Sequence, residues 1–341
     1  MHRTPRTIIA VALLGACTGV APTDPLPENG DPFAAELAAV EARILASPND
    51  AEAFADRARL QERRDSLVLA MNDWKRAIAL DTSNAEHRIA LADLYYRKIQ
   101  LPQAEEQLRN AIRSAPLMTE PKLKLAELKL VQRQYQEAMD LTNDALRIDQ
   151  HHARGYYLKG WIYKETGDTT KAISSYRTAV EQDPMFFEPL MELGLLHSDR
   201  HDALAMDYFN SALAIRPAST EALYGKGMFA QENDMDSVAL ECYARIKVID
   251  DRNALPWYNT GYILLDHQGR TTEAREQFTT AIELLPTYAQ AYYNRGLTYE
   301  LESRLDSAYG DYRKALALRP DMTLAAEGLG RLQRKGLQVT P

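Results

Sequence analysis

The stretch YYNRGLTYELESRLDSAYGDYRKALALRP, residues 292–320, carries the pattern that decides the fold of this chain. Small residues, Gly296, Ala308 and Ala315, stand among large side chains at helical spacing. Small residues let two helix backbones approach closely, and large side chains fill the space between the helices. Pro320 stops the second helix, because proline cannot donate the next backbone hydrogen bond. The stretch therefore predicts a pair of packed helices.

The same pattern recurs along the chain with a period of 34 residues. Its clearest marker is a series of small residues, one in each period: Ala58, Ala92, Ala126, Gly160, Gly194, Gly227, Gly261, Gly296 and Gly330. The spacing shortens by one residue near His201 and lengthens by one near Gly269, and we expect loops to absorb both changes. Because no single unit can bury its own faces, the units are expected to stack on their neighbours.

A 34-residue period with these residues resembles the tetratricopeptide repeat. The family's signature positions are held here by Tyr292, Gly296, Tyr299, Ala308, Tyr312, Ala315 and Pro320. The resemblance implies an all-α fold, a right-handed superhelical solenoid of about eight helix-turn-helix units with a concave groove. The repeats cover 51–320, with units expected at 51–84, 85–118, 119–152, 153–186, 187–219, 220–253, 254–288 and 289–322. A capping helix is expected within 33–48, and a second capping helix with a tail at 323–341.

Some units depart from the repeat pattern. Repeat one has Arg57 and Gln61 where apolar residues are expected, and repeat three has Lys129 and Thr142. These units are expected to be looser or atypically packed. The closing helix should present a polar outer face formed by Arg331, Gln333, Arg334 and Lys335.

Two positions of each first helix should line the groove, if the chain follows the resemblance. One lies directly after the small residue, and the other lies three residues before it. Near the N-terminus the first of these is charged, as Arg59, Asp93 and Glu127, whereas further along the chain it is apolar. The second position is apolar throughout and becomes rich in tyrosine and methionine toward the C-terminus. The predicted partner-binding residues are Tyr157, Trp161, Met191, Leu195, Tyr224, Met228, Tyr258, Tyr262, Tyr293 and Leu297.

Aromatic residues and methionine at such positions favour partner binding, because they offer large and adaptable contact areas. Trp161, Tyr258 and Tyr262 are the suggested anchors. The tyrosines before the small residue could instead stack between adjacent units. A tighter superhelix could also bury the apolar residues against each other, so this alternative stays open.

The N-terminal residues predict a signal peptide and a lipid anchor. Arg3 and Arg6 precede a short apolar run, which ends at Leu14-Gly15-Ala16-Cys17. This ending resembles the lipobox of bacterial lipoproteins, and the resemblance implies removal of residues 1–16 and lipidation of Cys17. The proline-rich segment 17–32 would then form a tether, with the protein most simply placed at the outer membrane facing the periplasm. Ordinary secretory cleavage and a chance apolar start are the alternatives.

The composition and the absence of known motifs argue against catalysis and against nucleic-acid binding. The chain has 40 basic and 48 acidic residues, a net charge of −8, and its basic residues are scattered. No nucleotide-binding glycine motif or hydrolase signature is present, so we expect no catalytic residue, no cofactor and no metal. His197 and His201 could share a metal on a helix, but His197 occupies a core position of the repeat. Cys242 has no expected partner.

The sequence therefore predicts a non-enzymatic, membrane-anchored periplasmic scaffold. A protein or peptide would bind in its groove and support the assembly of an envelope complex. There are two alternative functions. The chain could be a lipoprotein that binds a small molecule or glycan, or it could form an oligomer through the groove.

Overall fold

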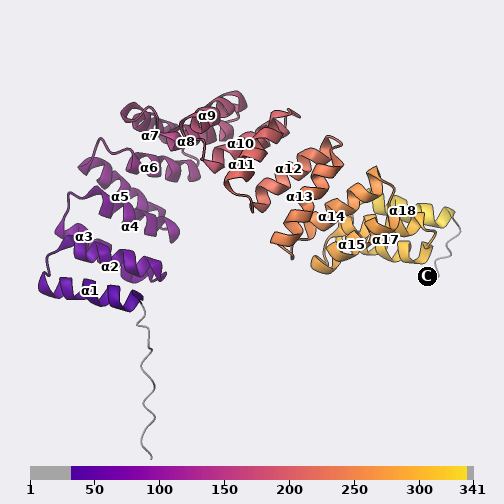
Figure 1. Ribbon diagram of the computed structural model, residues 1–341, viewed down its shortest axis with the longest axis horizontal. Helices are drawn as coiled ribbons and strands as arrows, with labels where there is room; N and C mark the ends of the chain where they lie inside the picture. The colour runs from indigo at the N-terminus through magenta and orange to yellow at the C-terminus, as the bar shows by residue number, and fades with distance from the viewer. Residues whose placement is uncertain (1–31, 336–341) are drawn as a thin grey trace, which may run out of the picture. The chain divides into compact units, whose positions relative to one another are not determined.

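The computed structural model describes residues 32–335, and these residues are built from helices alone. They form eighteen α-helices and one π-helical turn, in chain order from α1 (Pro32–Ala46) to α18 (Thr323–Arg334) (Figure 1). The predicted all-α fold is confirmed. Cys17 and the expected signal segment 1–16 lie outside the described residues. Within 32–335, no helix is both long and apolar enough to cross a bilayer.

The chain divides into two compact units, with the boundary between Gln100 and Leu101. The first unit contains α1, α2 (Ala51–Arg63), α3 (Leu67–Leu80) and α4 (Ala85–Arg97). In this unit each helix packs on the next one along the chain. The boundary falls inside the expected repeat 85–118, between its two helices.

The second unit continues the helix order with α5 (Leu101–Ser114), α6 (Glu120–Val131), α7 (Tyr135–Ile148), α8 (Ala153–Glu165), α9 (Thr169–Gln182), α10 (Phe187–Ser198), α11 (Leu204–Ile215), α12 (Thr220–Glu232), α13 (Asp236–Ile249), α14 (Ala254–Tyr262), η1 (Ile263–His267), α15 (Thr271–Leu284), α16 (Ala289–Leu301), α17 (Leu305–Leu318) and α18. From α6 to α17, each first helix packs on the second helix of its own pair. Each second helix then packs on the first helix of the next pair, which is the stacking that the repeat requires.

In repeats four to eight, the glycine of each first helix lies against an aromatic ring of its own second helix. A Cβ atom added to Gly194 would lie 2.7 Å from the ring of Phe209, and one added to Gly261 would lie 2.8 Å from Phe278. Both rings are fully buried and have no room to move aside. Glycine is therefore required because the two helices approach too closely for any side chain.

The turn inside each pair places one residue in the left-handed conformation. These residues are Asp65, Ile99, Arg133, Gly167, His201, Asp234, Gly269 and Ser303, with φ between +51° and +84°. Such a residue ends a helix and lets the following N–H group reach back to an earlier carbonyl, as the N–H of Ser66 does to Gln61 (2.9 Å). The shortened spacing near His201 falls in this turn, as expected.

The extra residue near Gly269 lies in a helix rather than in a loop, so that prediction was wrong. After Tyr262 the first helix continues into the π-helical turn η1. The N–H of Gln268 bonds to the carbonyl of Ile263 (3.2 Å). A π-helical turn is wider by one residue and keeps its backbone groups hydrogen-bonded. It therefore absorbs an insertion that a regular α-helix could not.

Three of the four polar residues that depart from the pattern in repeats one and three have partners in the interior, whereas the buried side-chain oxygen of Gln61 has none among the described residues. Arg57 forms two hydrogen bonds with the buried Asp73 (2.7 and 2.8 Å). The buried Lys129 Nζ bonds to Glu105 (2.7 Å), and Thr142 donates to the carbonyl of Ala138 (2.7 Å). These units are thus atypically packed, through ion pairs and side chain–backbone bonds in place of apolar contacts.

The closing helix α18 exposes Gln333, Arg334 and Lys335, as expected for a polar outer face. Arg331 and Lys335 also bind the buried carboxylate of Glu300 on α16 (2.9 Å each). The phenol of Tyr312 donates a third bond to Glu300 (2.7 Å). Basic residues on α18 therefore attach the helix to repeat eight.

Candidate functional site

Five consecutive first helices of the second unit each place an apolar side chain at the same repeat position. Together they form what we call the apolar row: Trp161, Leu195, Met228, Tyr262 and Leu297, on α8, α10, α12, α14 and α16. Leu195 is 40% exposed, and the other four are partly buried. The row therefore keeps accessible apolar surface, although its members also contact the repeats that carry them.

The tyrosines three residues before each glycine face inward. The ring of Tyr157 lies 5.8 Å from Tyr176, that of Tyr258 lies 5.7 Å from Phe278, and that of Tyr293 lies 5.7 Å from Tyr312. Each partner belongs to the second helix of the same repeat. Burial raises the pKa of the Tyr157 phenol to about 12.

Two of these tyrosines also contact the start of the next repeat. Tyr157 lies 5.2 Å from Phe186, and Tyr258 lies 4.8 Å from Tyr288, measured between ring centroids. Phe186 and Tyr288 directly precede α10 and α16. This inner series thus stacks within and between repeats, and only part of each ring remains for a partner.

Met191, the member of the inner series in repeat five, is buried. It is 4% exposed and packs in a cluster with Phe187, Leu190 and Phe209. Because it offers no surface to a partner, we leave it out of the proposed binding face. Leu195, one turn further along α10, is 40% exposed.

Sequence reasoning missed a pair of asparagines that join successive first helices. The amide of Asn259 donates to the phenol oxygen of Tyr224 (3.4 Å), and that of Asn294 donates to Tyr258 (3.0 Å). Both asparagines stand two residues before the small residue of their repeat, and both are buried. Their shared repeat position was the available signal. These bonds position Tyr224 and Tyr258 beside the apolar row.

The charged positions nearer the N-terminus are paired. In the first unit, Arg59 binds Glu52 and Asp56 at 2.7 Å each. In the second unit, Glu127 binds Arg154 of the next first helix. Exposed pairs of this kind are worth little to stability. They make these faces polar, in contrast to the apolar row.

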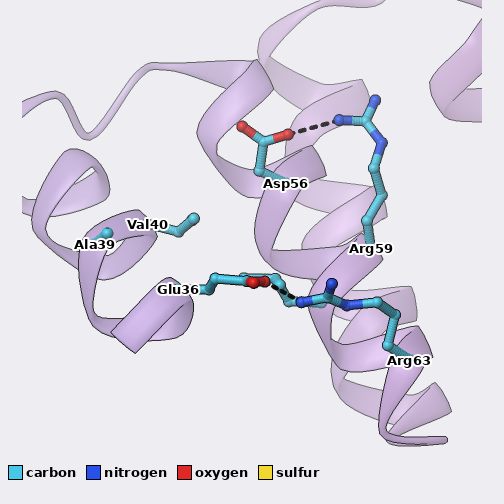
Figure 2. Close-up of a pocket in the computed structure, with 7 residues that line it drawn as sticks. Glu36, Ala39, Val40, Asp56, Arg59 and Arg63 are labelled. Atoms are coloured by element: carbon cyan, nitrogen blue, oxygen red, sulfur yellow. Dashed lines mark hydrogen bonds and ion pairs between the residues drawn. The ribbon is translucent and has the colours of Figure 1, made fainter. Parts of the chain in front are cut away.

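A cavity of about 420 Å³ lies between α1 and α2 in the first unit (Figure 2). Its lining residues are Glu36, Ala39, Val40, Asp56, Arg59, Leu60 and Arg63. The charges at its edge are already joined as the pairs Glu36–Arg63 and Asp56–Arg59. The cavity offers a partner no unpaired charge.

The residues considered for chemistry are structural. His197 is buried, and its Nδ1 lies 2.8 Å from Asp202 Oδ2, as expected for a core position. α10 ends at Ser198, before His201. Burial raises the pKa of the Cys242 thiol, which favours the unreactive protonated form. Within residues 32–335, no three His, Cys, Asp or Glu side chains are placed to hold a metal ion.

Comparison with known proteins adds the family of the repeat. Models described as tetratricopeptide repeat match residues 89–153, 153–184 and 289–322, and a model described as TPR repeat matches residues 267–303. These matches confirm that the chain contains tetratricopeptide repeats. The tetratricopeptide fold generally serves as a non-enzymatic scaffold that binds proteins or peptides.

Curated relatives share these repeats over part of their length. The chain is 27% identical over 191 residues to BBSome complex member BBS4 of Bos taurus, covering 56% of this chain and 36% of that protein. It is 25% identical over 264 residues to DnaJ homolog subfamily C member 7 of Homo sapiens, covering 72% and 49%. The chain thus spans half or less of the length of these relatives.

Solved structures support the fold alone. The C-terminal part of a TPR repeat-containing protein from Cytophaga hutchinsonii matches with a TM-score of 0.60 and 16% identity, over 71% of this chain and 99% of that one. The APC/C hetero-tetramer Cut9-Hcn1 matches with a TM-score of 0.51 and 16% identity, over 85% and 57%. The chain is an all-α solenoid that contains tetratricopeptide repeats.

Proposed function

We propose that this chain is a non-enzymatic scaffold that binds a protein or peptide along the apolar row. The observation that carries the proposal is the row itself, with one accessible apolar side chain from each of five consecutive first helices. A run of apolar side chains at one repeat position offers a continuous contact for an extended or helical segment. Tyrosine and tryptophan in such a row supply large contact areas at low entropic cost.

The supporting geometry is the rigid backing of the row. Tyr224 and Tyr258 are held by asparagines of the following repeats, and Met228 Sδ accepts from the phenol of Tyr243 (3.3 Å). A surface held in place before binding loses little conformational freedom when a partner arrives. Trp161 and Tyr262 are the anchors that retain accessible area.

The test is binding of the partner to a Trp161→Ala, Tyr262→Ala double variant. Affinity capture from the cell envelope with mass spectrometry would identify a partner, and titration with that purified partner would measure the affinity. Each anchor is expected to contribute ~2 kcal/mol, or about thirty-fold in Kd. Val248→Ala is the matched control, because Val248 is 85% exposed on a second helix, away from the row. Unchanged affinity in the double variant would show that the row is not the binding face.

We also propose that Cys17 carries a lipid anchor and that the scaffold faces the periplasm. Support for this comes from the residues alone, the positive start followed by Leu14-Gly15-Ala16-Cys17. Stable attachment requires at least two acyl chains, which a lipidated N-terminal cysteine would supply. Cys17→Ser should move the protein from the membrane fraction to the soluble fraction. A protein that stays in the soluble fraction with Cys17 intact would contradict the anchor.

A further inference from the structure

Four repeats place a positive side chain at the same interior position, one residue before the small residue. These side chains are Arg57, Lys159, Lys226 and Arg295. In repeats one and eight, the residue sixteen positions later is an aspartate on the second helix. Arg57 binds Asp73, and Arg295 binds Asp311, each through two hydrogen bonds of 2.7–2.8 Å.

Repeat four keeps the positive charge and lacks the aspartate. The residue sixteen positions after Lys159 is Ser175, whose hydroxyl donates to the carbonyl of Lys171 (2.8 Å). Ser175 is 8% exposed, and the aspartates at this position in repeats one and eight are 6% and 7% exposed. The same buried location thus holds a carboxylate in two repeats and a neutral hydroxyl in this one. Lys159 has no ion-pair partner among the described residues, and its side chain is partly buried.

Two polar cavities open on either side of Lys159, and both are lined by Tyr156 and Lys159. One, of about 240 Å³ between α8 and α9, is completed by Tyr163, Lys171, Ser174, Ser175 and Thr178. The other, of about 320 Å³ between α7 and α8, is completed by Asn143, Leu146, Arg147 and Gln150. Neither cavity has an aspartate or glutamate in its lining, although the chain as a whole is acidic.

Free hydrogen-bond donors surround the same lysine. The Tyr163 phenol and the Ser174 hydroxyl have no partner among residues 32–335. Lys171 also lines this cavity, but its ammonium group pairs with Asp168 (2.7 Å) and lies 5.3 Å from the centre of the Tyr163 ring. An ammonium group with hydroxyl donors, in a cavity whose lining has no carboxylate, is suited to a phosphate group.

We propose that the cavity between α8 and α9 binds the phosphate group of a small soluble phosphomonoester. Lys159 supplies the charge that pairs with the phosphate, and Ser174 and Tyr163 donate hydrogen bonds to its oxygens. The ligand's phosphate takes the place that the carboxylates of Asp73 and Asp311 take in repeats one and eight. The cavity is large enough to hold more than a bare phosphate, at roughly eight water volumes of ~30 Å³ each.

The experiment compares phosphate with chloride at matched ionic strength on the full chain. Inorganic phosphate and glucose 6-phosphate are titrated by calorimetry, and the melting temperature is followed in parallel. Lys159→Gln should weaken phosphate binding at least ten-fold, because it removes a charged hydrogen bond. Ser175→Asp should abolish phosphate binding and raise the melting temperature in chloride, because the new carboxylate would itself pair with Lys159.

Lys226→Gln is the matched control. Lys226 holds the same repeat position, faces the neutral Cys242 and lines neither cavity, so this variant should bind phosphate as the unaltered chain does. The proposal is overturned if phosphate acts no differently from chloride, or if Lys159→Gln and Ser175→Asp both bind normally. Equal loss in Lys226→Gln would also overturn it. Binding to phosphatidylglycerol vesicles without binding to glucose 6-phosphate would contradict a soluble ligand.

Discussion

The helix pairs α10–α11 and α16–α17 are built on the same repeat but have interiors of different chemistry. In both pairs a glycine of the first helix faces an aromatic ring of the second, Gly194 against Phe209 and Gly296 against Tyr312. Around Phe209 the interior is apolar. Around Tyr312 it contains the buried carboxylates of Asp311 and Glu300.

This difference shows which interior positions the fold constrains strictly. The glycine and the ring are constrained by shape, because the helices touch at that point. The neighbouring positions accept either apolar residues or charges, provided that each buried charge has a partner. Arg295 pairs with Asp311, and Arg331 and Lys335 pair with Glu300, so the ionic interior meets this condition.

The largest loss of stability is expected from removing a buried ring from the apolar interior of repeat five. Phe209→Ala removes a fully buried ring that touches both Gly194 and Gly225, and it should destabilise the protein by ~4 kcal/mol. Urea denaturation followed by circular dichroism measures this loss. Val248→Ala, at an exposed site, should change stability by less than ~0.5 kcal/mol. A loss below ~1.5 kcal/mol for Phe209→Ala would mean that the interior around it repacks easily.

The second largest effect on stability is expected from replacing the buried ion pair of repeat eight with apolar residues. Asp311→Leu alone should cost ~3 kcal/mol, because it leaves Arg295 partly buried without its carboxylate. Arg295→Leu combined with Asp311→Leu should come within ~1 kcal/mol of the unaltered chain. A double-mutant cycle from denaturant unfolding measures the coupling. If the double variant is as unstable as the single one, the charges are required for the fold itself.

The smallest of the three stability losses is expected at the contact between α18 and Glu300, and this loss depends on pH. Burial alone would raise the pKa of Glu300, but bonds from Arg331, Lys335 and Tyr312 lower it to about 2, from an ordinary value of 4.5. A lowered pKa in the folded state stabilises the protein above the unfolded value, and this contribution is lost as the pH falls through the folded value. Glu300→Gln should therefore cost ~2 kcal/mol at pH 7.

The pH series provides the check on that interpretation. The difference between Glu300→Gln and the unaltered chain should shrink as the pH falls from about 5 to about 2, the interval between the two pKa values. Glu276→Gln, on the exposed side of α15, should show no such trend. A difference that is constant across this range would mean that the charge of Glu300 does not stabilise α18.

Much of the fold could be predicted from the sequence, because the repeat depends on local patterns. The glycine series marked where the two helices of repeats four to eight approach each other. The π-helical turn at Ile263–His267 could not be predicted, because the spacing alone does not show whether an extra residue lengthens a loop or widens a helix. The partner-binding residues were identified by position, but their exposure depended on the stacking of neighbours. Leu195 is exposed and Met191 is buried, although both are apolar residues on one helix.

The sequence by itself determined the period, the small and large positions, and hence the helix pairs that must pack together. Only the tertiary structure decided which interior charges are neutralised. Arg57 and Arg295 find aspartates on the opposite helix, whereas Lys159 meets a serine. The physical reason is that a charge is paired by whatever lies within ~4 Å in space. Helix packing brings together residues sixteen positions apart, which no local pattern marks as partners.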